Sequence, residues 1–483
     1  MSEKSSSKKM PRYEKWLFAS GDMYGGGAQI IISFYYLIFL TDVVGIRPAL
    51  AGAIVLVSKI WDAVSDPLMG VITDNTRTKH GRRKPYFLAG FLGIIIAFFL
   101  LWYPVGFDSQ IGKFIFVLFS YLFYSTIQTM VMVPYAAMSS EISVDFDERT
   151  SVNGLRLFLS QFSTMLCAVL PIEIVKMMPD VKSGYITMAI IFGVFFALPY
   201  ILMFFYTKER VPYKRDDKSR FNYTTFIEPF KVKSFRYLLG IYMSSFLAMD
   251  IVSAVFAYYM NYYLERPPEL NYVLGFMLLF QTIMVPVIVR IAKAIGKANT
   301  VKVSLVVWLV GVFFLAFQTA QSAWWTIYAV AGIMGIGIGG CVVMAWTMYP
   351  DVTDVGEFAF KRRNAGSFGG IMTFMRKFSA AIGIFIVSQI LDLAGYVQPL
   401  QKVVDGATVN ILQEQSAAVI TAIKIIAVFF PVVLIGLTYL FAKKYPLTHK
   451  IYERLSIQIK FERGEKEEGL DRKEIKELEE TLI

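Results

Sequence analysis

Long apolar blocks alternate with short polar segments along almost the whole chain of 483 residues. The hydrocarbon core of a bilayer is about 30 Å thick, and an α-helix needs about 20 apolar residues to cross it. Blocks of that length predict twelve transmembrane helices, near residues 24–44, 50–72, 86–106, 112–138, 154–175, 184–206, 237–263, 270–293, 300–320, 324–349, 367–394 and 416–442. The pattern therefore predicts an all-α polytopic membrane protein.

The longest polar insert follows the sixth block and divides the blocks into two sets of six. We expect a cytoplasmic tail at 1–23, a six-helix bundle at 24–206, a cytoplasmic central loop at 207–236, a second bundle at 237–442 and a cytoplasmic tail at 443–483. This arrangement is typical of transporters built from internal repeats, which hold their substrate near the bilayer midplane.

Basic residues gather in alternate loops. Arg82, Arg83 and Lys84 follow the second block, whereas the opposite loops hold single residues such as Arg47 and Lys113. Cytoplasmic loops of membrane proteins are enriched in Lys and Arg. We therefore expect both termini in the cytoplasm and the chain in the plasma (inner) membrane.

Composition narrows the possible functions. Hydrophobic residues make up 56% of the chain and charged residues 18%, and the net charge of +11 is typical of cytoplasmic loops that face anionic lipid. Two cysteines and two histidines leave no basis for a disulfide framework or a Cys/His metal site. We expect a monomer in the lipid bilayer, with no cofactor and no nucleic-acid partner.

Two acidic residues, Asp62 and Asp66, lie inside the second apolar block. Their four-residue spacing puts both on one helical face. A charge at the bilayer centre costs at least about 2.5 kcal/mol, so such acids are functional-site candidates. They can form a cation site, or one of them can pair with Lys59 or Arg156 and only fix helix packing. Asp250 is a third intramembrane acid.

The segment after this block resembles a signature of the major facilitator superfamily. Gly70, Asp74 and Arg77 precede Gly81, and the basic run 82–84 follows. The resemblance implies two six-helix bundles and a cytoplasmic gate whose charged pairs break and re-form. The predicted gate residues are Asp74, Arg77, Arg82, Arg83, Lys84, Asp351, Asp354, Glu357 and Arg363.

Several further motifs narrow the resemblance to the glycoside-pentoside-hexuronide:cation symporters, over nearly the whole chain. The motifs lie at 41–45, 61–70, 133–135, 141–143 and 351–357, with Lys377 in the eleventh block. The resemblance implies that Asp62 and Asp66 bind the coupling cation with help from Ser65 and Thr129. Carboxylate and hydroxyl oxygens suit a hard cation such as Na+, whereas H+ needs only one carboxylate. Both ions remain open.

The resemblance says less about the substrate. Two acids that hold the sugar in the melibiose-carrier branch correspond here to Gly26 and Met132, whereas two cations are matched by Arg156 and Lys377. Lost acids and retained cations favour an anionic sugar such as a hexuronide, which arginine can clamp. The remaining predicted substrate residues are Gln128, Tyr124 and Trp346.

The sequence therefore predicts cation-coupled symport of a glycoside, pentoside or hexuronide by alternating access. A cation-coupled lysolipid carrier and a non-transporting membrane sensor are alternatives. An enzyme is not expected, because acids one turn apart on one helix cannot flank a glycosidic bond. Asp250 can pair with Lys377 or Arg376, or face the substrate cavity.

Overall fold

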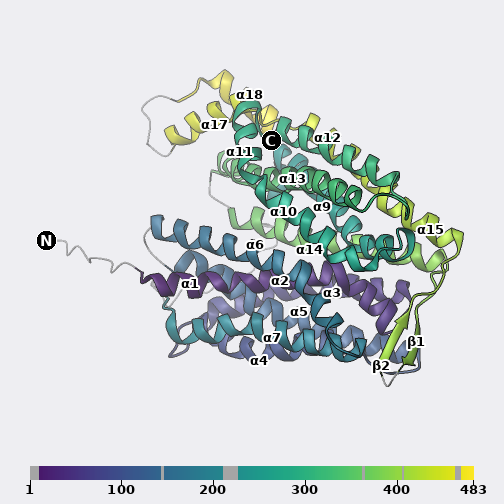
Figure 1. Ribbon diagram of the computed structural model, residues 1–483. Coiled ribbons are helices and arrows are strands. Elements are labelled where there is room, and N and C mark those ends of the chain that lie inside the picture. Colours follow the sequence, from purple (N-terminus) through teal and green to yellow (C-terminus); the bar gives the residue numbers. More distant parts are fainter. Residues whose placement is uncertain (1–9, 143–145, 210–226, 362–364, 405–406, 463–468) are drawn as a thin grey trace. The chain divides into compact units, whose positions relative to one another are not determined.

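A computed structural model describes residues 10–142, 146–209, 227–361, 365–404, 407–462 and 469–483 (Figure 1). Its contacts divide the chain into two compact units. Unit 1 contains the chain before Asn222 together with Ser388–Ser416, and unit 2 contains Asn222–Val387 and Ala417–Ile483. The division agrees broadly with the two predicted bundles, although it falls inside a helix near residue 388. Most of the predicted central loop lies outside the described residues.

Unit 1 is built mainly from long helices. They are α1 (Arg12–Ser20), α2 (Asp22–Ile31), the π-helical segments η1 (Ile32–Tyr36) and η2 (Phe39–Val43), α3 (Pro48–Asn75), α4 (Lys84–Leu101), α5 (Gln110–Glu141), α6 (Phe146–Lys176) and α7 (Val181–Tyr206).

Unit 2 begins at the short 3-10 segment η3 (Glu228–Lys231). It continues with α9 (Lys233–Tyr258), the π-helical η4 (Tyr259–Tyr263), η5 (Pro267–Glu269), α10 (Leu270–Ile283), α11 (Val285–Ile295), α12 (Lys297–Ala316), α13 (Trp324–Phe360), most of α14 (Ala365–Leu393), α15 (Ala417–Lys424), η6 (Ile425–Phe429), α16 (Phe430–Lys443), α17 (His449–Glu462) and α18 (Arg472–Leu482).

The membrane spans agree with the sequence pattern with two exceptions. Among the described residues, ten helices are long and apolar enough to cross a bilayer. The predicted span 270–293 is instead a pair, α10 and α11, bent by 43°. Pro286 lies at the break and has no N–H to continue the α-helical ladder. The predicted span 24–44 is helical, but π-helical turns interrupt it at η1 and η2.

Three segments expected to be loops or tails carry regular structure. Helix α1 occupies part of the predicted N-terminal tail, and α17 and α18 form in the C-terminal tail. Strands β1 (Leu400–Val404) and β2 (Ala407–Ile411) form an antiparallel hairpin in which Leu400 pairs with Ile411. This hairpin corrects the all-α expectation, because backbone groups outside a helix can pair across a short turn.

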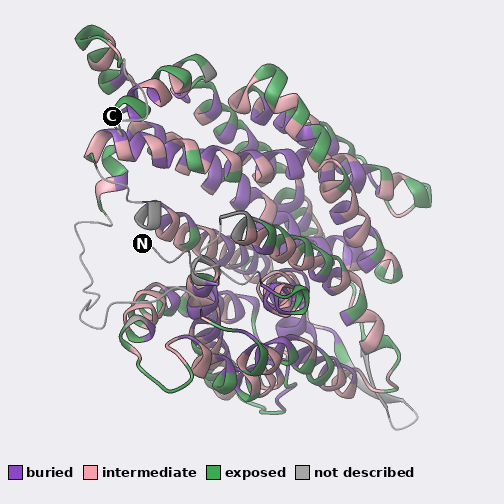
Figure 2. Cartoon of the chain, turned by 90° about the vertical axis from the view of Figure 1, so that its left-hand side faces the viewer, coloured by how far each residue is buried: buried purple, intermediate pink, exposed green. Residues whose placement is uncertain are grey.

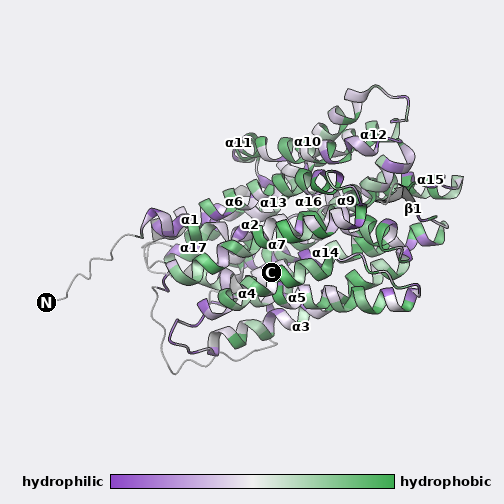
Figure 3. Ribbon diagram, turned by 60° about the horizontal axis from the view of Figure 1, so that its bottom comes forward, coloured by the Kyte–Doolittle hydropathy of each residue, from purple (hydrophilic) through white to green (hydrophobic). Residues whose placement is uncertain are grey.

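The helices turn apolar side chains outward as well as inward. Figure 2 shows buried residues along the inner helix faces and exposed residues on the outer faces. Exposed apolar side chains in unit 1 include Leu92, Phe119 and Phe158. In Figure 3 hydrophobic residues cover most of each long helix, and hydrophilic residues gather near helix ends and connections. A protein in water would not expose this much apolar surface, so the outer faces are suited to lipid.

Candidate functional site

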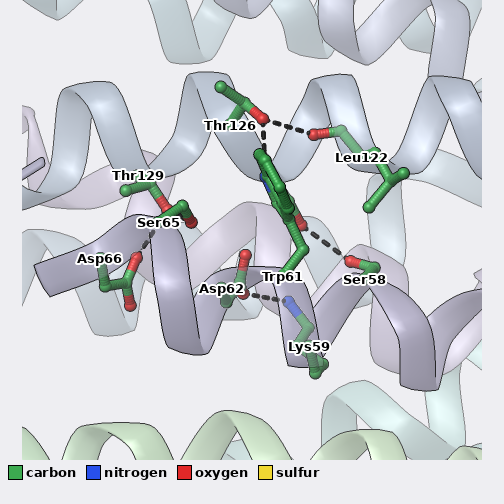
Figure 4. A network of polar contacts seen from close by, with 10 residues as sticks. Ser58, Lys59, Trp61, Asp62, Ser65, Asp66, Leu122, Thr126 and Thr129 are labelled. Atoms are coloured by element: carbon green, nitrogen blue, oxygen red, sulfur yellow. Dashed lines mark hydrogen bonds and ion pairs between the residues drawn. The ribbon is translucent and has the colours of Figure 1, made fainter. Parts of the chain in front are cut away.

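A row of polar contacts joins α3 to α5 along the interior of unit 1 (Figure 4). Ser58 and Ser125 share a hydrogen bond of 2.8 Å between their hydroxyls, and the indole N–H of Trp61 donates to Thr126 at 2.9 Å. The residues of α3 in this row recur every three or four positions, which places them on one helical face. The row fixes how the two helices pair along the next turn.

Three of the four predicted cation ligands meet on this face. The hydroxyl of Thr129 donates to Oδ1 of Asp66 at 2.6 Å, and the hydroxyls of Ser65 and Thr129 lie 3.5 Å apart. Because the Thr129 proton is directed at Asp66, Ser65 is the donor in the second contact. Thr129 is buried and Asp66 is half-buried. The cluster offers one carboxylate and two hydroxyl oxygens, the donor set of a hard monovalent cation.

The fourth predicted ligand, Asp62, lies one turn earlier and has a cationic neighbour. Lys59 Nζ lies 2.9 Å from Asp62 Oδ2, and both side chains are buried. Of the two pairings that the sequence allowed, the structure selects Lys59. The two carboxylates are therefore unequal, since Asp62 is held by an ammonium group and Asp66 by a hydroxyl.

Arg156 pairs with an acid that sequence reasoning did not single out. Its Nη2 lies 3.6 Å from Asp22 Oδ2, and its guanidinium lies 4.5 Å from the ring centre of Tyr135. Its Nη1 also donates to Asn153 at 3.0 Å. The position of Asp22 directly before the first apolar block was the signal available in the sequence. The Arg156 guanidinium is thus held between α2 and α5 by a carboxylate and a ring face.

The other predicted substrate residues of unit 1 lie in packed surroundings. A Cβ at Gly26 would come within 2.5 Å of the Ser160 hydroxyl, so glycine lets α2 pack on α6. The Met132 sulfur accepts a hydrogen bond from Tyr200 at 3.2 Å. Tyr124 lies in an aromatic cluster, and Gln128 is buried.

In unit 2 the third intramembrane acid has found its partner. Arg376 binds Asp250 through two contacts, with Nη1 to Oδ2 at 2.6 Å and Nη2 to Oδ1 at 2.9 Å. The guanidinium also lies 4.6 Å from the ring centre of Phe246. Lys377 is half-buried on the same helix, and Trp346 is 44% exposed beside Tyr242.

The predicted gate residues of unit 1 surround a second acid that the sequence pattern did not reveal. Glu209 accepts the backbone N–H groups of Arg82 at 3.1 Å, Arg83 at 2.8 Å and Lys84 at 3.3 Å. Gly81 adopts a φ of 105°, which allows the chain to turn into α4. Glu209 therefore caps the N-terminus of α4.

The other members of this gate have local or undescribed contacts. Arg83 Nη1 donates to the Thr73 hydroxyl at 2.6 Å, and Arg77 Nη1 donates to the Thr76 carbonyl at 2.8 Å. The side chain of Asp74 lies outside the described residues.

The gate residues of unit 2 lie on the last turns of α13, which extends beyond the predicted span. Lys297 Nζ lies 2.6 Å from Asp351 Oδ2, and the hydroxyl of Tyr452 on α17 donates to Asp354 at 2.8 Å. Glu357 is half-buried one turn later, and Arg363 lies outside the described residues. Part of the predicted C-terminal tail thus docks on this acidic segment.

These features define a class of protein, a polytopic membrane transporter with buried charged groups on its helices. Residues 17–449 match the family described as MFS/sugar transport protein. The chain therefore belongs to this family, which consists of transport proteins and not of enzymes.

Similar proteins agree with that assignment. The putative glycoside/cation symporter YagG of Escherichia coli (strain K12) is 27% identical over 92% of this chain and 93% of its own length. The sodium-dependent lysophosphatidylcholine symporter 1-A of Danio rerio is 24% identical over 91% of this chain and 87% of its own. The inward-open structure of the xylose transporter XylE from E. coli has a TM-score of 0.60 at 11% identity, covering 90% of this chain and 96% of that one. The last similarity supports the major facilitator fold.

Proposed function

We propose that the protein is a secondary active transporter that couples the movement of a sugar to that of a monovalent cation, Na+ or H+. The observation that carries this proposal is the oxygen cluster of Ser65, Asp66 and Thr129 on two membrane helices. A carboxylate has no packing advantage over a hydrophobic residue at such a position. A cation that neutralises it supplies a reason for its presence.

Coupling follows from charge. An ion beside Asp66 lowers the net negative charge around the two acids and allows the loaded carrier to change state. The substrate binds near Arg156 in unit 1 and Lys377 in unit 2, and the carrier alternates between inward-open and outward-open states. The charged contacts at 82–84 and around Asp351 break and re-form during this cycle.

The substrate class is a glycoside, pentoside or hexuronide. YagG is named a glycoside/cation symporter, which supports a sugar. Arg156 and Lys377 without an acid at positions 26 and 132 favour an anionic sugar, because a guanidinium holds a carboxylate through two hydrogen bonds. The protein acts as a monomer in the plasma (inner) membrane with both termini in the cytoplasm.

A lysolipid carrier is the second candidate. Two observations favour it, the similarity to a lysophosphatidylcholine symporter and the thioether of Met132 where an acid would serve a sugar. A phosphate headgroup would also suit Arg156. The sugar remains the better proposal, since the family match is to sugar transport proteins.

The test is uptake into proteoliposomes of labelled galactosides, glucosides, pentosides, hexuronides and a lysophospholipid, under a Na+ gradient and separately under a pH gradient. We expect accumulation of one sugar class that collapses with one gradient. Asp66→Asn should abolish accumulation, whereas Asp108→Asn, in the exposed loop between α4 and α5, should leave it unchanged. Movement of the lysophospholipid alone would replace the sugar with the lipid, and full accumulation by Asp66→Asn would refute the coupling site.

A further inference from the structure

Lys59 is the nearest cationic group to the proposed ion site. It lies one helical turn before Asp62 on α3, and 2.9 Å separates its Nζ from Asp62 Oδ2. The side chains of Lys59 and Asp62 are 5% and 1% exposed, and the ammonium lies 5.7 Å from the ring centre of Tyr121 (Figure 4). Because both residues belong to one helix at a spacing of three, the pair moves with α3 as a unit.

The charges on this part of the molecule are few and can be counted. Between Arg47 and Asp74 the only charged residues are Lys59, Asp62 and Asp66. Helix α5, which supplies Thr129, has no charged residue between Lys113 and Glu141. One positive group against two negative groups leaves a net charge of minus one on the segment of α3 that carries the site.

A buried net charge is unfavourable in a medium of low dielectric constant. A single monovalent cation beside Asp66 brings the cluster to neutrality, because Lys59 has already neutralised the other carboxylate. Without Lys59, two monovalent cations would be needed for the same result. The ammonium group thus sets how many ions a neutral, loaded carrier contains.

We propose that Lys59 is a tethered counter-ion that remains on Asp62 throughout the cycle and fixes the requirement of the site at one monovalent cation. This inference rests on the proposed function, since it presupposes that the mobile ion binds beside Asp66. It assigns Asp62 a role through charge and Asp66, Ser65 and Thr129 the direct contacts with the ion.

A different role for Lys59 is that of a placeholder which leaves Asp62 when the ion arrives. The two roles predict opposite results for Lys59→Met. A fixed counter-ion requires the variant to bind two cations, whereas a placeholder leaves one cation that binds more tightly. Asp62 contacts the ion directly only in the placeholder scheme.

Four purified proteins separate these schemes, with Na+ as the probe and choline as the balancing ion. The number of bound Na+ ions is obtained from calorimetric titration and from the steepness of the rise in Tm with Na+ concentration. We expect one ion for the wild type, two for Lys59→Met, none for Asp62→Asn and one again for Lys59→Met/Asp62→Asn. Lys176→Met is the matched control, since Lys176 forms an exposed pair with Glu173 at the same spacing.

Restored single-ion binding in the double variant is the decisive result, because that protein lacks both members of the pair and keeps Asp66. Single-ion binding by Lys59→Met, or no recovery in the double variant, would overturn the inference. If Lys59→Met does not fold, the double variant and Asp62→Asn still decide.

If a pH gradient alone drives the wild type, the same count is made for protons from the gradient at which net substrate flux vanishes. A wild type that responds to neither gradient would overturn the proposed function itself, which is a different failure.

Discussion

Two buried acid–base pairs, one in each unit, use opposite geometry. Lys59 and Asp62 belong to one helix and meet through a single contact of 2.9 Å. Asp250 on α9 and Arg376 on α14 come from different helices and meet through two contacts of 2.6 and 2.9 Å, with Phe246 against the guanidinium. The first pair ties no helices together, whereas the second joins two.

This difference teaches how a buried charge can serve transport in one place and architecture in another. A two-pronged pair between helices fixes their spacing, and at Gly383 a Cβ would lie 3.0 Å from the Asp250 Cβ, so α9 and α14 approach closely there. A pair within one helix leaves the neighbouring helices free to respond when an ion binds at Asp66. We therefore assign the α3 acids to ion coupling and the Asp250–Arg376 pair to the stability of unit 2.

The largest effect on stability should come from breaking the pair in unit 2. Asp250→Asn leaves the Arg376 guanidinium buried without its carboxylate and should lower the free energy of unfolding by about 3–5 kcal/mol. Thermal unfolding of the purified protein measures it. The double variant Asp250→Asn/Arg376→Met should lose less, because no charge is left unpaired. Equal losses in the single and double variants would show that the pair is not the source of the stability.

A smaller effect is expected from one ligand of the ion site. Thr129→Val removes the hydroxyl that donates to Asp66 at 2.6 Å, and a hydrogen bond to a charged group contributes about 1.5–3 kcal/mol. The cation concentration for half-maximal uptake should rise by about tenfold or more. Thr126→Val, one turn away and bonded to Trp61, is the matched control. If both variants shift by the same amount, Thr129 has no special role in ion binding.

The smallest effect should appear at the segment that unit 1 receives from beyond α14. Tyr396 donates a 2.6 Å hydrogen bond to Asp42 at the end of the first span. Tyr396→Phe should therefore lower the free energy of unfolding by about 1 kcal/mol. Tyr445→Phe removes a buried hydroxyl that makes no hydrogen bond within the described residues, and its Tm should stay close to that of the wild type. Identical melting of both variants would contradict the proposed attachment.

The sequence predicted the features that depend on local patterns. Apolar length located the membrane helices, and a spacing of three or four residues placed Asp62 with Lys59 and Asp66 with Ser65 on one face. The π-helical turns in the first span were not predicted, since hydrophobic periodicity does not distinguish them from α-helix. The bend at Pro286 was readable from the proline but was assigned to one continuous span.

Contacts between distant residues could not be read from the pattern. Asp22 finds Arg156 across 134 positions, and Glu209 reaches the start of α4 across more than 120, as numbering shows. For Asp250 the sequence left three possibilities, and helix packing selects Arg376. The hairpin at 400–411 was missed because it lies in a polar connection where backbone pairing, not side-chain periodicity, makes the structure.

The central claim is that the acids of α3 couple the ion and that Asp250 does not. Its most direct test is the accumulation ratio of substrate in proteoliposomes for Asp66→Asn and Asp250→Asn, normalised to folded protein, under the gradient that drives the wild type. We expect Asp66→Asn to equilibrate substrate without concentrating it and Asp250→Asn, although less stable, to keep the wild-type ratio. Accumulation by Asp66→Asn together with its loss in Asp250→Asn would contradict the account.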